Sequence, residues 1–106
     1  MSYRFMRIIV FFDLPVTTLE GRRNYTAFRK FLIRSGFIMM QESVYCKLAL
    51  NAVTAGSIME HVRRNSPQDG LIQMLMVTEK QYNNIEYIIG ENSHETIDSS
   101  DRLVVL

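Results

Sequence analysis

The sequence predicts a single α+β domain over residues 1–106, with strands and helices in the order β-α-β-β-α-β and further strand signals after them. At 106 residues the chain has the size of one domain. Its hydrophobic fraction of 47% is ordinary for a globular protein, which argues against a disordered chain. Apolar runs typical of strands alternate with segments whose apolar residues recur at helical spacing. No repeat, low-complexity segment or linker divides them.

The first strand is expected at Ile8–Phe12, where five consecutive apolar residues indicate a strand buried on both faces. It ends at Asp13-Leu14-Pro15. A helix to about Ser35 follows, because Thr17-Thr18-Leu19-Glu20 has the spacing of a capping box, in which a threonine oxygen caps the helix and a glutamate three residues on reaches back. Gly36 is placed to end this helix in a left-handed cap. The core stripe of the helix is expected to hold Tyr25, Phe28, Phe31 and Leu32.

The middle of the chain predicts a hairpin and a second helix. Residues Phe37–Leu50 alternate apolar and polar side chains with a break near Gln41-Glu42, so we expect two short strands or one sharply bent strand. Asn51 can cap a helix over about residues 52–64. His61 is expected on the polar face of this helix. The apolar face is formed by Ala55, Ile58, Met59 and Val62.

The last third of the chain carries three strand signals. After the turn cluster at 65–70, strands are expected at Leu71–Thr78 and at Ile85–Ile89, and a polar loop at Glu91–Ser100 precedes a terminal strand at about 101–106. The element order fits a ferredoxin-like sheet with both helices on one face and an extra C-terminal strand. An unpaired apolar edge is a hazard that a second chain removes. We therefore expect a homodimer paired through Leu103, Val104 and Val105; the alternative is that this strand folds back onto its own sheet.

Composition also bounds location and partners. Residues 1–64 hold ten Lys/Arg and four Asp/Glu, whereas residues 65–106 hold two basic and seven acidic residues. This asymmetry fits either a basic working face or an uneven solvated surface. The single cysteine, Cys46, excludes an internal disulfide and a multi-cysteine zinc site, and a buried thiol is expected. Met1–Arg4 lacks a signal-peptide layout, and no apolar run approaches the ~20 residues that span a bilayer, so we expect a cytoplasmic protein with no membrane contact.

Asp13 is the candidate residue for metal chemistry. It is the only acid in the first 19 residues, and the end of a buried strand is a rigid mount for a carboxylate. One carboxylate makes a poor magnesium site, but in a two-fold dimer two copies of Asp13 could share an Mg²⁺ ion. That ion would polarise a phosphate and lower the pKa of a bound water. The alternative is that Asp13 only caps the turn before Pro15.

The first helix carries the candidate nucleic-acid surface. Five basic residues occur within 13 positions, with no acid among them, and their spacing predicts a face away from the core stripe. Such a surface suits a phosphate backbone, although a solvated helix face would look the same. Arg63 and Arg64 could extend it, or could instead complement the dipole of the second helix. The five residues of the first helix are Arg22, Arg23, Arg29, Lys30 and Arg34.

These features together resemble the CRISPR-associated protein two family. The resemblance covers nearly the whole chain and rests on the order of several motifs rather than on one. An apolar strand ending in Asp13 precedes a basic helix with Tyr25 and Phe28, and then Gly36-Phe37. The other matching segments are Gln41-Glu42-Ser43-Val44-Tyr45, Thr78-Glu79-Lys80-Gln81 and Arg102-Leu103-Val104, the last two being similar to the branch found beside type II interference systems.

The resemblance implies a prokaryotic protein of CRISPR spacer acquisition. Family members are ferredoxin-like homodimers whose C-terminal strand completes the partner's sheet. They sit between CRISPR integrase subunits and help to hold a short DNA duplex, and some bind magnesium between two strand-end aspartates and cleave RNA or DNA. Asp13 matches that aspartate by position, and Ser43 matches a serine near the dimer axis, which makes it a second, weaker catalytic candidate.

Two functions from different classes therefore stand. One is a scaffold that binds double-stranded DNA and bridges the integrase subunits. The other is a magnesium-dependent endonuclease or endoribonuclease that uses paired Asp13. The sequence offers no second carboxylate near Asp13 and no obvious general base, which favours the scaffold. The fold alone would also allow a regulatory domain that binds a small molecule.

Overall fold

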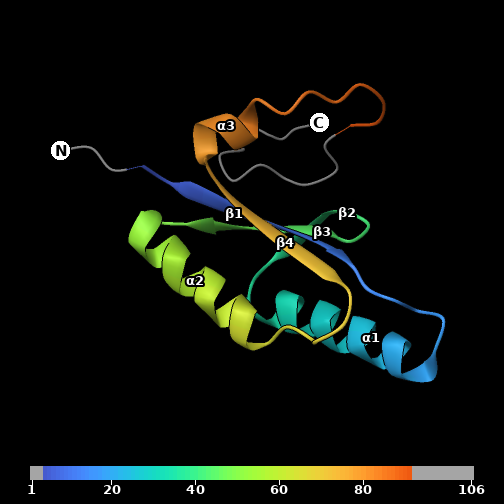
Figure 1. The fold of residues 1–106 in the computed structure, drawn as a ribbon. Coiled ribbons are helices and arrows are strands. Elements are labelled where there is room, and N and C mark those ends of the chain that lie inside the picture. Colours follow the sequence, from blue (N-terminus) through green and yellow to red (C-terminus); the bar gives the residue numbers. More distant parts are fainter. Residues whose placement is uncertain (1–3, 92–106) are drawn as a thin grey trace.

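The structure, a computed structural model, describes residues 4–91 and confirms the ferredoxin-like α+β fold. Its four strands form one antiparallel sheet in the order β2-β3-β1-β4. Figure 1 shows α1 and α2 covering one face of this sheet and α3 on the opposite face. The strands are β1 (Met6–Asp13), β2 (Ile38–Gln41), β3 (Val44–Ala49) and β4 (Leu71–Thr78), and the helices are α1 (Leu19–Arg34), α2 (Ala52–Arg64) and α3 (Glu79–Asn83).

Strand β1 lies between β3 and β4, which explains its apolar character on both faces. Side chains alternate between the two faces of a strand. Ile8, Val10 and Phe12 point toward α1 and α2 and belong to the main core. Arg7 and Ile9 point the other way and are buried as well. The sheet therefore has a helix-covered face and a second face, called here the open face.

Helix α1 begins one residue later than the predicted capping box requires. Its N-cap is Thr18, whose Oγ1 accepts from the backbone N–H of Gly21 at 2.9 Å. The prediction that Glu20 reaches back to complete a capping box is wrong, because the third helical position is Gly21. A Cβ there would lie 2.4 Å from the carbonyl oxygen of Pro15, so the position accepts no side chain. The helix ends as predicted, with Gly36 at φ 93°.

The hairpin and the second helix follow the prediction. The break near Gln41 is a tight turn between β2 and β3, and it holds Ser43 at φ 64°. The side chain of Asn51 caps α2 by accepting from Thr54 N at 2.8 Å. The predicted core stripes of both helices lie against the sheet, with Tyr25, Ile58 and Met59 partly buried and Phe28, Phe31, Leu32, Ala55 and Val62 buried.

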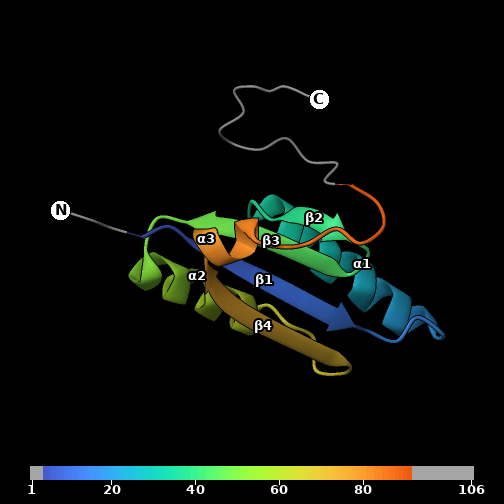
Figure 2. The same ribbon diagram turned by 90° about the horizontal axis from the view of Figure 1, so that it is seen from above.

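The predicted strand at Ile85–Ile89 is wrong. After β4 the chain forms the short helix α3, whose start is fixed by a capping box between Thr78 and Gln81. The helix turns the chain onto the open face and away from the edge of β4 (Figure 2). The apolar run after it therefore meets no strand edge and has no regular structure. The predicted terminal strand, with Leu103, Val104 and Val105, lies outside the described residues.

Candidate functional site

The open face of the sheet is apolar and only partly covered. α3 lies over the part nearest Arg7, whereas large apolar side chains farther along the sheet stay accessible. Leu71 and Leu75 on β4 are 55% and 49% exposed, and Ile38 on β2 is also exposed. Their register partners Asp13, Ile9 and Cys46 place these three side chains on the open face. Large apolar side chains left exposed on one face of a sheet are typical of an interaction site.

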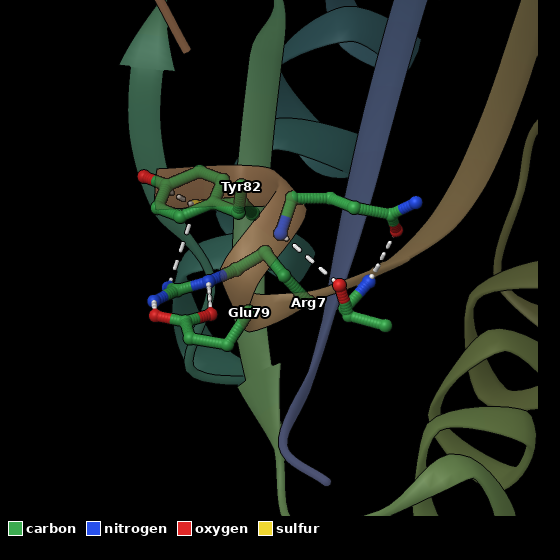
Figure 3. Close-up of polar contacts among 6 residues, drawn as sticks. Arg7, Glu79 and Tyr82 are labelled. Atoms are coloured by element: carbon green, nitrogen blue, oxygen red, sulfur yellow. Dashed lines mark hydrogen bonds and ion pairs between the residues drawn. The ribbon is translucent and has the colours of Figure 1, made fainter. Parts of the chain in front are cut away.

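A buried arginine holds α3 on the open face. Arg7 is only 6% exposed, and its Nε donates to Glu79 Oε1 at 2.9 Å while Nη2 forms an ion pair with the same carboxylate. The guanidinium carbon lies 4.2 Å from the ring centroid of Tyr82 (Figure 3). Nη1 also lies 3.7 Å from the Cys46 sulfur. One side chain of β1 thus contacts two side chains of α3, which is a charge-assisted and cation–π attachment.

The protonation states of this cluster suit its role. Burial lowers the pKa of Arg7, but the hydrogen bond to Glu79 and the neighbouring charges outweigh it and raise the pKa, so the guanidinium stays charged. Burial raises the pKa of Tyr82, and its contact with Cys46, whose Sγ lies 3.6 Å from the hydroxyl oxygen, adds to the shift. The tyrosine is therefore neutral at physiological pH.

The sheet brings the two predicted catalytic candidates to the same end of the molecule. Asp13 is the exposed last residue of β1, and it shares the open face with its register partner Leu71. The backbone N–H of Phe12 donates to the carbonyl oxygen of Ser43 at 3.0 Å. The turn between β2 and β3 therefore lies beside the strand end that carries Asp13.

This arrangement supplies only part of a metal site. Within residues 4–91, no group of three or more His, Cys, Asp or Glu side chains could hold a metal ion. Magnesium is commonly bound through one or two carboxylates and keeps several waters. A single exposed Asp13 supplies one carboxylate toward such an ion, and the other ligands would have to come from elsewhere.

The basic residues of α1 form a separate surface. Four of the five predicted positions line one shallow groove of about 460 Å³, together with Thr26 and Ala27 and without any carboxylate. Arg29 is exposed but lies outside this lining. The groove is on the helix-covered side of the molecule, whereas Asp13 is on the open face. The four basic residues, called here the α1 groove residues, are Arg22, Arg23, Lys30 and Arg34.

Arg63 and Arg64 occupy a different environment. Both form ion pairs with Glu60 on the exposed side of α2. Arg63 Nη1 lies 2.5 Å from Glu60 Oε1, and Arg64 Nε lies 3.2 Å from Glu60 Oε2. The hydrogen bond from Arg63 lowers the pKa of Glu60. These arginines are partly neutralised and also complement the C-terminal end of α2. Their contact with nucleic acid stays a prediction.

Comparison with known proteins assigns the chain to a family. Residues 6–85 match the family model described as CRISPR associated protein Cas2. The chain belongs to the Cas2 family. It is 56% identical over 101 residues to the CRISPR-associated endoribonuclease Cas2 of Treponema denticola, a match that covers 95% of this chain and 100% of that protein. The protein of the same name from Streptococcus mutans serotype c (strain UA159) is 45% identical over 101 residues, covering 95% of this chain and 93% of that protein.

The fold agrees with this Cas2 assignment. A solved structure described as "Crystal structure of cas2" superposes with a TM-score of 0.57 at 15% identity, covering 95% of this chain and 99% of that one. At this level of identity the likeness concerns the fold. No helix among the described residues of this Cas2 chain is long and apolar enough to cross a membrane.

Arg7 is the residue that attaches α3 to the sheet, and the sequence analysis did not single it out. Its partner lies 72 positions away, so no local spacing reveals the pair. Two signals point toward it: a lone charge beside the apolar run of β1, and the capping-box spacing of Thr78 and Gln81, which indicates a helix at Glu79.

We expect Glu79→Gln to lower the free energy of unfolding by about 1–3 kcal/mol, because a buried guanidinium would be left without its charged partner. Urea denaturation of the full chain measures this change. Glu60→Gln is the matched control, since Glu60 also pairs with arginine but at the exposed surface, where ion pairs contribute little. Equal denaturation midpoints for the two variants would contradict a structural role for the Arg7–Glu79 pair.

Proposed function

We propose that this Cas2 chain acts as a homodimeric scaffold of spacer acquisition that binds a short DNA duplex and bridges CRISPR integrase subunits. The observation that carries the proposal is the α1 groove, in which four cationic side chains converge without a carboxylate. A surface of this composition attracts a phosphate backbone by charge and reads no base sequence. Such a scaffold has to bind nucleic acid of any sequence.

The dimer is proposed from the open face. Its exposed apolar side chains, among them Leu71 and Leu75, gain burial if a second copy packs against them. A two-fold contact uses the same patch on both chains, so the two α1 helices end on the outer sides of the dimer. Two basic grooves at a fixed separation can position a duplex between integrase subunits. Pairing of the segment at 101–106 with the partner's sheet remains part of this proposal.

A second candidate function is a magnesium-dependent endonuclease or endoribonuclease. The observation that favours it is the placement of Asp13 on the open face, where a two-fold contact brings two copies toward one axis. The relatives are also named endoribonucleases. In this mechanism the paired Asp13 carboxylates would hold the ion, with Ser43 in the neighbouring turn, and a bound ion would supply Lewis-acid activation of a water and of the phosphate. Because each chain supplies only one carboxylate to this site, the scaffold remains the better supported function.

We expect Lys30→Glu to weaken binding of a short DNA duplex and to lower the slope of log K against log salt by about 0.9 for each phosphate that the variant no longer neutralises. Fluorescence anisotropy at several salt concentrations measures both effects. Lys80→Glu is the matched control, because Lys80 is an exposed lysine on α3, on the other side of the sheet. If both variants bind with the same affinity and slope, the α1 groove is not the binding surface.

We expect Asp13→Ala to reduce any magnesium-dependent cleavage of labelled RNA or duplex DNA at least about 100-fold, because the metal contributes several kcal/mol to such reactions. The purified full chain is assayed with magnesium and with a chelator. Asp13→Asn serves as a second variant, since it removes the charge and keeps the shape. Cleavage that withstands both substitutions would rule out the paired-carboxylate site, while the duplex-binding measurement would still test the scaffold.

A further inference from the structure

A second hollow lies on the helix-covered side, between the end of α1, strand β3 and helix α2. Its volume is about 420 Å³, and it is separate from Asp13 and from the open face. No carboxylate lines it. The polar residues that line it are Arg34, Ser35, Lys47, Thr54, Ser57 and His61, and we call this hollow the Lys47 pocket.

Lys47 is held at this pocket by the backbone. It pairs in register with Ile8, so its side chain points toward the helices, and its Nζ donates to the carbonyl oxygen of Ser35. Gly36 packs close by, because a Cβ at that position would lie 3.1 Å from the same nitrogen. An ammonium group has three N–H donors, so two remain for a ligand. A cation that is already fixed in place gives up little conformational entropy when it binds.

The other polar groups of the pocket complement this ammonium. Within residues 4–91, Arg34, Lys47 and His61 form no ion pair with a carboxylate. The His61 ring centroid lies 5.1 Å from that of Phe31, a contact that restricts the ring beside the pocket. Thr54 and Ser57 add hydroxyl donors from α2. Cations and hydroxyls around a hollow without carboxylates match the oxygens of a phosphate group.

The pocket adjoins the α1 groove. Arg34 lines both of them, so a strand that follows the groove arrives at the pocket. We propose that the Lys47 pocket binds a phosphate group of the nucleic-acid strand that lies along α1. The inference rests on the proposed function for the source of the phosphate, and on the pocket itself for the binding chemistry.

The pocket is tested first without nucleic acid. Inorganic phosphate is titrated into the ¹⁵N-labelled full chain at constant ionic strength, with sodium chloride as the balancing salt. We expect backbone amide shifts at Ser35, Gly36 and Ser57, and at least tenfold weaker binding in Lys47→Gln. Lys80→Gln is the matched control and should bind as the wild-type chain does. Because Lys47 also contacts Ser35, the exposed His61→Gln is a second variant, and it should weaken phosphate binding while leaving the rest of the spectrum in place.

The strand is tested separately, by duplex binding across salt concentrations. We expect Lys47→Gln to lower the salt slope by about 0.9 for the one phosphate that it no longer neutralises, and Lys80→Gln to leave the slope unchanged. Phosphate shifts that are absent from the pocket, or that withstand both Lys47→Gln and His61→Gln, would overturn the proposal. A duplex slope that Lys47→Gln does not change would overturn it as well. Failure of the proposed α1 groove gives a different result from failure of the pocket. In that case Lys30→Glu leaves duplex binding unchanged. The phosphate titration contains no duplex, so it still tests the pocket by itself.

Discussion

The structure depends on strand β1, which is central in the sheet and needs cover on both faces. Right-handed crossovers place α1 and α2 on the same face, so the other face receives no full-length helix from the described part of the chain. The chain covers part of that face with the five residues of α3 and leaves Leu71 and Leu75 accessible. A second copy is the simplest means of covering the remainder, and this requirement links the topology to the proposed dimer.

The Arg7–Glu79 pair decides which part of the open face is covered. A short helix cannot attach itself by apolar area alone, and here a buried guanidinium and the Tyr82 ring fix it. The opposite end of β1 stays open, and that end carries Asp13. The fold therefore places two kinds of site on opposite sides of the sheet: the Asp13 carboxylate at the end of the open face, and a basic groove with the Lys47 pocket on the helix-covered side.

Local signals in the sequence predicted most of the fold. The apolar run of β1, the Asn51 cap and the left-handed Gly36 each depend on neighbouring residues, and each prediction was confirmed. The strand predicted at Ile85–Ile89 was wrong because α3 carries the following apolar run away from the free edge of β4. The grouping of the basic residues in α1 follows from helical spacing. The Arg7–Glu79 pair and the Lys47 pocket join distant segments, so they become visible only in three dimensions.

The central claim is that the open faces of two copies meet with their Asp13 residues near the axis. Cross-linking of Asp13→Cys with a short bis-maleimide tests it most directly, because Cys46, the only native thiol, is buried. The proposed dimer predicts a covalent dimer on a denaturing gel for Asp13→Cys and none for Lys30→Cys, which places the new thiol on the outer side of α1. Efficient cross-linking of Lys30→Cys, with Asp13→Cys remaining monomeric, would contradict this arrangement.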